Sequence, residues 1–227
     1  MAIEYRYELK YMLSKGKAAL LKQQLKALMY LDSHSVSSEY SYQIRSVYFD
    51  DDNSSAYLEK VDGVEFRSKY RLRMYNFDES YLVLECKHKD EDMTYKESCR
   101  ISYEQALQLL EGRYDLIDTA DPFFKKFLAA ALSKHLKPAV IVDYRRLAYV
   151  LPVSDVRITF DEELRSGRYS HDFFNKDIVT FDLYHDKGIV LEVKYNEFLP
   201  EPIVKVLSSI PMLRQSFSKF VACQSIQ

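Results

Sequence analysis

Three short segments of the chain repeat one pattern, in which a glutamate and a lysine two positions apart lie within an apolar or aromatic stretch. The segments are residues 7–11 (YELKY), 84–88 (LECKH) and 191–195 (LEVKY). Because a β-strand turns alternate side chains to opposite faces, the glutamate and lysine of each segment share one face. The residue between them points to the other face. The pattern therefore predicts a sheet with one charged face and one apolar face.

Further polar residues follow the same two-residue spacing, and most of them are cations. The sets are Lys69, Arg71 and Arg73; Glu85, Lys87 and Lys89; Lys96, Ser98 and Arg100; and Arg157, Thr159 and Asp161. For any one set, cross-strand ion pairs on a solvated face are a sufficient explanation. Across all four sets cations outnumber acids, and such a face repels itself unless a polyanion lies against it. Arginine binds phosphate oxygens with a planar fork and lysine adds a point charge, so the pattern favours a site for an extended phosphate chain.

The composition excludes several other classes of function. The 227 residues carry a net charge of -2, so no overall basicity indicates nucleic-acid binding. The three cysteines are odd in number and lack CxxC spacing, which predicts reduced thiols with neither a disulfide nor a zinc site. No P-loop, GxGxxG turn or GxSxG elbow occurs. No apolar run approaches the roughly 18 residues of a membrane-spanning helix, and we expect a cytoplasmic protein.

The periodicity of the sequence predicts an α+β protein with a single domain over residues 1–227. We expect strands at residues 4–13, 42–49, 65–75, 81–89, 95–102, 139–149, 156–160, 178–183 and 189–195. Helices are expected at residues 14–31, 56–60, 102–112, 121–136, 202–207 and 218–223, with Ser14, Ser102 and Asp121 as N-caps. About eight long antiparallel strands with alternating charges suggest closure into a β-barrel with a polar lumen and helices outside.

Glu192 lies among aliphatic residues of a predicted strand, two positions from Lys194. A glutamate in this place could simply pair with a neighbouring arginine. It could equally bind Mg²⁺ or Mn²⁺, hard cations that take carboxylate and phosphate oxygens. One or two carboxylates together with the phosphates of a substrate suffice for such a site, so both interpretations stay open.

Eight phrases of the sequence resemble, in the same order, the VTC domain. This is the catalytic domain of polyphosphate polymerases, within the triphosphate tunnel (CYTH-like) superfamily. The phrases are residues 6–11 (RYELKY), 46–50 (SVYFD), 70–75 (YRLRMY), 84–87 (LECK), 144–149 (YRRLAY), 156–161 (VRITFD), 191–195 (LEVKY) and 217–220 (FSKF). The resemblance implies a closed eight-stranded antiparallel barrel, the triphosphate tunnel, with helices packed outside.

The resemblance also implies roles for individual residues. Lys10, Arg71, Arg73, Lys87 and Arg146 would hold phosphates, Tyr144 would be a hydroxyl donor beside them, and Glu192 would be the metal ligand, with Glu8 and Glu85 as further candidates for Mn²⁺ or Mg²⁺. Lys60 and Lys194 would also serve the phosphates, and Ser218 and Lys219 would contact the phosphate chain at a tunnel mouth. The two-residue spacing adds Lys69, Lys96, Arg100 and Arg157 as substrate-binding residues.

On this resemblance we expect a metal-dependent polymerase that moves the γ-phosphoryl of ATP onto a growing inorganic polyphosphate chain. The first strand reads Arg6-x-Glu8-x-Lys10 where triphosphatase relatives read Glu-x-Glu-x-Lys. Losing an acid for a cation favours holding a long anion over hydrolysis. The alternatives are a tripolyphosphatase or nucleoside triphosphatase, and a non-catalytic polyphosphate-binding module.

On this resemblance we expect the catalytic module alone, without the regulatory and membrane-spanning segments that are joined to the domain in eukaryotic polymerases. If the product crosses a membrane, we expect a separate membrane-protein partner to supply the pore. This chain would then be peripheral at the inner face of that membrane.

Overall fold

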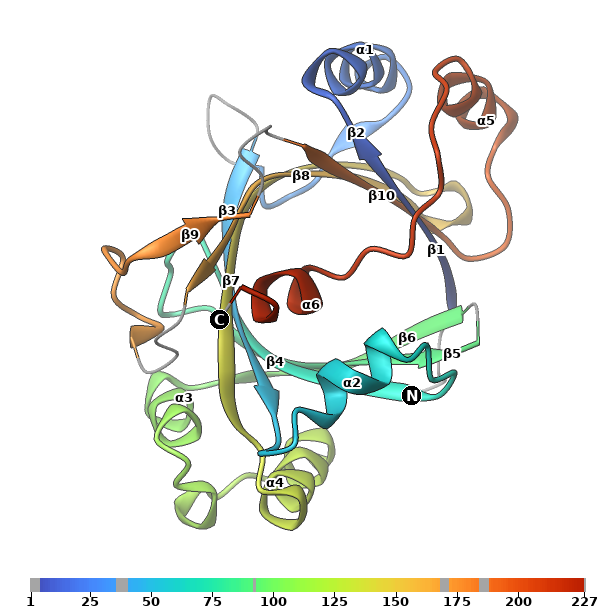
Figure 1. The fold of residues 1–227 in the computed structure, drawn as a ribbon. Helices are drawn as coiled ribbons and strands as arrows, with labels where there is room; N and C mark the ends of the chain where they lie inside the picture. Colours follow the sequence, from blue (N-terminus) through green and yellow to red (C-terminus); the bar gives the residue numbers. More distant parts are fainter. Residues whose placement is uncertain (1–4, 36–40, 92, 168–171, 184–187, 227) are drawn as a thin grey trace.

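Strand β7 (Lys137–Leu151) closes an antiparallel sheet on itself, because it pairs with β3 (Ser41–Asp50) on one side and β8 (Val156–Gly167) on the other. The computed structural model describes residues 5–35, 41–91, 93–167, 172–183 and 188–226. Around the barrel the order is β7, β3, β4 (Arg67–Tyr75), β5 (Leu82–Asp90), β6 (Met93–Ile101), β1 (Arg6–Leu13), β10 (Ile189–Tyr195) and β8. The short strands β2 (Tyr30–Leu31) and β9 (Thr180–Asp182) pair with β7 and β8 (Figure 1). The predicted α+β fold with a closed eight-stranded barrel is confirmed.

The register places the glutamate–lysine segments against one another. Lys10 of β1 is opposite Glu192 of β10, and Glu8 is opposite Lys194. Between β4 and β5, Arg71 is opposite Glu85. Because directly opposed residues share a face of the sheet, these side chains all point to one side, the lumen of the barrel. The repeat in the sequence thus becomes a charged inner wall.

Local signals in the sequence set the starts of several helices. The α-helices of the described residues are α1 (Lys15–Lys26), α2 (Ser55–Val61), α3 (Tyr103–Leu110), α4 (Pro122–Lys134), α5 (Glu201–Ser208) and α6 (Lys219–Gln224), with 3₁₀ turns η1 (Tyr114–Leu116) and η2 (Val153–Asp155). The side chains of Ser14, Ser102 and Asp121 each accept a backbone N–H of the first turn, as the N-cap prediction requires. The capping box that begins at Ser102 is complete.

Two predicted boundaries are wrong. The first helix ends at Lys26 and not near residue 31, because Tyr30 and Leu31 form β2 opposite Val150 and Tyr149. Partners in the sheet satisfy the main-chain groups of these residues, and this pairing outweighs the helical spacing of the leucines. Strand β8 also continues to Gly167, well beyond the predicted end at residue 160. Glu4, included in the first predicted strand, lies outside the described residues.

Helices cover the outer face of the barrel in two groups (Figure 1). Helices α3 and α4 pack over β3, β4 and β5 in one apolar cluster, with Phe124 and Phe127 fully buried. Helices α1 and α5 pack over β1, β8 and β10 in a second cluster that contains Leu21 and Ile203. No helix of the described residues is both long enough and apolar enough to cross a bilayer.

Helix α6 lies over the bore of the barrel, and in Figure 1 it appears inside the ring of strands. Its Phe220 ring stacks on Tyr48 of β3 with centroids 4.9 Å apart, and both belong to an apolar cluster that includes Val140 and Val142 of β7. The neighbouring Lys219 is also buried. The C-terminal segment therefore contributes side chains to the lumen itself.

Candidate functional site

The lumen is a cavity of about 900 Å³ whose wall is strongly cationic. Fifteen lysine and arginine side chains line it against three glutamates, although the whole chain carries a net charge of -2. The structure brings all the predicted site residues except one into this wall: Glu8, Lys10, Lys60, Lys69, Arg71, Arg73, Glu85, Lys87, Lys96, Tyr144, Arg146, Arg157, Glu192, Lys194, Ser218 and Lys219. Such a segregation of charge creates a strong positive potential in a low-dielectric channel.

The exception is Arg100, which does not line the cavity. It shares a strand face with Lys96 and Ser98 and lies near the end of β6, opposite Val83, which does line the cavity. Its guanidinium lies 4.4 Å from the centroid of the Tyr81 ring and donates a hydrogen bond to the Ser80 carbonyl at 3.2 Å. The two-residue spacing predicts the face of a residue but not the contacts that its side chain makes.

Arg71 and Arg73 are held in fixed positions by hydroxyl and carboxylate groups of three neighbouring strands. The Arg71 Nε donates to Glu85 Oε2 at 2.7 Å, and its Nη1 donates to the Tyr48 hydroxyl at 3.0 Å. The Nε of Arg73 donates to Ser46 Oγ at 3.0 Å, and its Nη2 donates to the Tyr144 hydroxyl, also at 3.0 Å. Two planar guanidinium groups are therefore ordered in advance, which is the arrangement that phosphate oxygens require.

Glu85 is surrounded by cations. Besides the bond from Arg71, it accepts a hydrogen bond from Lys96 Nζ at 2.7 Å, and Arg73 Nη1 lies 3.6 Å away. Burial by itself would raise the pKa of this carboxyl, but the three cations outweigh it and hold the pKa well below its usual range. Glu85 therefore acts as a fixed negative charge that positions the arginines.

A second ion cluster joins β8, β10 and α6. Glu192 lies 2.6 Å from Lys219 Nζ and 3.0 Å from Lys194 Nζ, and Arg146 binds Asp161 through Nε and Nη2 at 2.6 and 2.7 Å. Lys194, Lys219, Lys10 and Arg146 outweigh the effect of burial and keep the pKa of Glu192 well below its usual range. The geometry therefore supports the ion-pair interpretation of Glu192 and leaves the metal interpretation open.

Two lysines of the wall, Lys69 and Lys87, have strongly depressed pKa values. Burial, reinforced by the charges of Lys10 and Arg67, lowers the pKa of Lys69 to about 7. Burial and neighbouring lysines also lower the pKa of Lys87 to about 7, and its ion pair with Glu8 only partly offsets them. A bound polyanion would relieve this repulsion.

The C-terminal segment lies against the same cationic region. Lys10 Nζ donates to the Phe217 carbonyl at 2.9 Å, Lys60 Nζ to Ser216 Oγ at 2.7 Å, and Lys69 Nζ to Ser218 Oγ at 3.2 Å. Ser218 is also the N-cap of α6. These contacts place Ser218 in the wall of the lumen, beside the lysines predicted to bind phosphate.

The three predicted metal ligands do not gather in one place. Among the described residues, no three Asp, Glu, His or Cys side chains form a group that could hold a metal ion. Glu8 and Glu192 both contact Lys10 and Lys194, and Glu8 Oε1 is a buried oxygen without a hydrogen bond. These two carboxylates fit one divalent cation that takes its other ligands from phosphate oxygens. Glu85 belongs to a separate cluster.

Several lumen residues were not assigned a role from the sequence. Lys89 belongs to the predicted set of Glu85 and Lys87 but was given no role, and Arg67 precedes Lys69 by two positions on the same face, so the spacing contained the signal for both. Arg214 reaches the wall because its backbone pairs with Tyr11, for which the sequence carries no signal.

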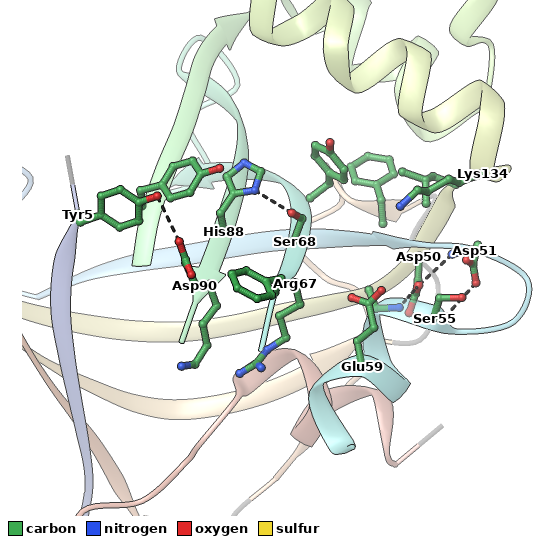
Figure 2. A pocket seen from close by; sticks show the side chains of 17 residues that line it. Tyr5, Asp50, Asp51, Ser55, Glu59, Arg67, Ser68, His88, Asp90 and Lys134 are labelled. Atoms are coloured by element: carbon green, nitrogen blue, oxygen red, sulfur yellow. Dashed lines mark hydrogen bonds between the residues drawn. The ribbon is translucent and has the colours of Figure 1, made fainter. Parts of the chain in front are cut away.

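A second cavity of about 330 Å³ lies on the outer side of β4 and β5 (Figure 2). Ser68 and His88, which line it, alternate with Lys69 and Lys87 and so face away from the lumen. The Nδ1 atom of His88 lies 2.7 Å from Ser68 Oγ, and its Nε2 lies 2.7 Å from Glu97 Oε2. These contacts give both ring nitrogens of His88 a partner, and Arg67 and Lys89 line this cavity as well as the lumen.

Solved structures share this fold at low sequence identity. A Bacillus halodurans protein provisionally assigned as an adenylate cyclase superimposes with a TM-score of 0.53 and 14% identity, over 92% of this chain and 89% of that one. The PH1819 protein of Pyrococcus horikoshii OT3 superimposes with a TM-score of 0.51 and 11% identity, over 98% and 99% of the two chains. At such identities the likeness shows the fold alone.

Sequence comparison identifies the family. No curated protein matches the sequence. The sequence profile of the VTC domain, in contrast, matches residues 5–226, which is nearly the whole chain. This chain therefore belongs to the VTC domain family.

Proposed function

We propose that this protein is a polyphosphate polymerase that transfers the γ-phosphoryl of ATP onto a growing inorganic polyphosphate chain. One observation carries the proposal. Among the described residues, fifteen lysines and arginines but three glutamates line the lumen of a VTC domain. A lumen of this kind suits a long, flexible polyanion because each successive phosphate meets a cation on the wall.

The proposed reaction needs little covalent chemistry from the protein. An oxygen of the terminal phosphate attacks the γ-phosphorus of ATP and forms a new P–O bond. The bond between the γ-phosphorus and the bridging β–γ oxygen breaks, and ADP leaves with that electron pair. Catalysis then consists of alignment and charge neutralisation. The terminal phosphate is already anionic near neutral pH, so no general base is required.

Residues of the lumen divide these tasks between them. Arg71 and Arg73, fixed by Glu85, Ser46 and Tyr144, would hold the transferred phosphoryl group in a defined orientation. Arg146 of β7, fixed by Asp161, would bind the triphosphate from another part of the lumen wall. The lysines, with longer and more flexible stems, would follow the phosphate chain as it moves.

A divalent cation, Mn²⁺ or Mg²⁺, would be held by Glu192 and Glu8 together with phosphate oxygens. When bound, it supplies positive charge at the β- and γ-phosphates. Lys194 and Lys219, which neutralise Glu192 in this structure, would then turn to the phosphates. We also predict, from the sequence, a cytoplasmic location, a single domain and a separate membrane-protein partner.

The proposal is tested by incubating the protein with ATP and Mn²⁺ or Mg²⁺ and resolving the products by gel electrophoresis and ³¹P NMR. Polymerase activity gives phosphate chains that lengthen with time together with ADP. Release of inorganic phosphate without chain growth would instead identify a triphosphatase. Tight binding of polyphosphate without turnover under either metal would identify a binding module.

A further inference from the structure

An aromatic corner lines the lumen at the end of β4 that lies farthest from α6. It consists of His34, Tyr75 and Tyr81, all three of which belong to the cavity wall. The centroids of His34 and Tyr75 are 4.7 Å apart, those of Tyr75 and Tyr81 are 5.9 Å apart, and those of His34 and Tyr81 are 6.2 Å apart. Tyr81 meets the other two rings nearly edge-on, at 64° and 71°, so the three rings form a corner and not a closed stack.

The rings are partly open to solvent and held in place from behind. The side chain of His34 is 38% exposed, and its Nδ1 lies 2.9 Å from Asp32 Oδ1. Asp32 in turn forms an ion pair with Arg157 of the lumen wall. The buried ring of Tyr42 packs against His34 and Tyr75, with its centroid 5.7 Å from the first ring and 6.1 Å from the second. A partly exposed aromatic surface with this support is suited to receive a planar partner, which would share the Tyr81 ring with the guanidinium of Arg100, 4.4 Å from its centroid.

The corner continues the row of inward-facing side chains on β4. Along this strand the row runs Lys69, Arg71, Arg73 and Tyr75, from Ser218 of the C-terminal segment to the aromatic corner. Lys69 and Tyr75 are six positions apart along the strand, a distance of about 20 Å. The guanidinium of Arg73 lies 5.9 Å from the centroid of the Tyr75 ring. Phosphate-binding and aromatic groups are therefore neighbours on one strand.

We propose that the aromatic corner binds the base of the nucleoside triphosphate, with its triphosphate directed to Arg73, Arg71 and Arg157. This inference rests on the proposed function, because it takes a nucleotide as the phosphoryl donor. Inorganic polyphosphate has no planar apolar group and gains nothing from three aromatic rings. A nucleobase stacks on tyrosine and histidine faces whatever its hydrogen-bonding edge, so the corner would retain nucleotides without a base-reading motif.

The orientation of the substrates follows from this placement. With the base at the aromatic corner, the γ-phosphate points along β4 toward Lys69 and the C-terminal segment. The acceptor chain then occupies the half of the lumen that contains Lys10, Lys60 and Lys69. The lumen thus has a nucleotide end and a polyphosphate end.

The test compares the dissociation constants of ATP and inorganic tripolyphosphate by calorimetry at one ionic strength, in wild type and variants. In Tyr81→Leu, the affinity for ATP should fall about tenfold, since base–aromatic stacking has this size. The affinity for tripolyphosphate should not change. Tyr81→Phe should retain both affinities, and a melting curve of each variant checks that it is folded. Tyr30→Leu is the matched control, because Tyr30 is 69% exposed on β2 and does not line the lumen.

Equal weakening of both ligands in Tyr81→Leu would overturn the base-binding role and indicate a general effect on the lumen. Unchanged ATP affinity in both Tyr81→Leu and Tyr75→Leu would also overturn it. These outcomes leave the polymerase proposal intact if the wild type still lengthens phosphate chains. A wild-type protein that binds neither ATP nor tripolyphosphate would overturn both proposals.

Discussion

Lys219 Nζ lies 2.6 Å from Glu192 Oε1, so an ammonium group of the C-terminal helix is paired with a carboxylate of β10 inside the lumen. The same atom lies 2.6 Å from Asp161 Oδ2 of β8. All three side chains are at least nine-tenths buried. The two carboxylates outweigh the effect of burial and raise the pKa of Lys219. One lysine therefore neutralises two buried acids and fixes α6 to the barrel wall.

This relationship predicts that Lys219→Met destabilises the protein. Removing one partner of a buried ion pair typically costs roughly 3–5 kcal/mol, and the loss here should be smaller because Arg146 still pairs with Asp161 and Lys194 with Glu192. Urea unfolding should show the midpoint of Lys219→Met shifted to lower denaturant. Lys205→Met, which removes an exposed ion pair with Glu201 on α5, should leave the midpoint in place. A Lys219→Met protein as stable as the wild type would mean that Lys194 and Arg146 alone neutralise both acids.

Arg73→Gln should weaken tripolyphosphate binding and abolish chain growth. A charge-assisted hydrogen bond to phosphate contributes about 1.5–3 kcal/mol, roughly 10- to 150-fold in affinity. Arg73 has only a long contact with Glu85, at 3.6 Å, so its loss leaves the shorter bonds of that carboxylate in place. Calorimetry with tripolyphosphate measures the affinity. Arg113→Gln, a change on the surface outside the lumen, is the control; equal binding by both variants would remove Arg73 from the site.

The sequence allowed the charged inner wall to be predicted, because strand periodicity relates residues two positions apart regardless of the rest of the fold. Lys69, Arg71 and Arg73 point inward as the spacing requires. The contacts of a side chain depend on its neighbours in the fold, and this is why Arg100 lies against Tyr81 and Ser80 and not in the cavity wall. The aromatic corner joins His34 of a turn, Tyr75 at the end of β4 and Tyr81 just before β5, so no local pattern in the sequence indicates it.

Polyanion binding should strengthen as the pH falls through about 7, the value to which the pKa values of Lys69 and Lys87 are lowered. Below this pH both lysines are charged and attract phosphate, whereas above it they become neutral. Affinity for tripolyphosphate measured from pH 6 to 8.5 should therefore decline with rising pH. In Lys69→Arg the decline should be shallower, because arginine stays charged throughout. An identical pH profile for both proteins would contradict a role for Lys69 in the titration.

The same two lysines predict how the stability of the ligand-free protein depends on pH. Their pKa values are lower in the folded than in the unfolded state, so the unfolded state binds more protons between about pH 7 and 10. The contribution of these two lysines to the free energy of unfolding should therefore increase as the pH rises over this range. Lys69→Met should show a smaller rise in urea unfolding. The two trends have opposite signs: higher pH stabilises the empty lumen and weakens its hold on phosphate.

Glu192→Gln should separate substrate binding from chemistry. The substitution keeps the shape of the side chain and removes its charge, so Lys194 loses a competing anion and becomes available to phosphate, while Lys219 stays paired with Asp161. We expect tripolyphosphate to bind at least as tightly as in wild type. Chain growth from ATP should nevertheless stop, because the carboxylate proposed to hold the divalent cation with Glu8 is gone. The measurement pairs tripolyphosphate calorimetry with a Mn²⁺-dependent chain-growth assay, and Glu201→Gln on the exposed face of α5 serves as the control. If Glu192→Gln kept near-normal rates, Glu192 would be only the partner of Lys219 and Lys194. The buried, unbonded Oε1 of Glu8 would then mark the carboxylate to test next.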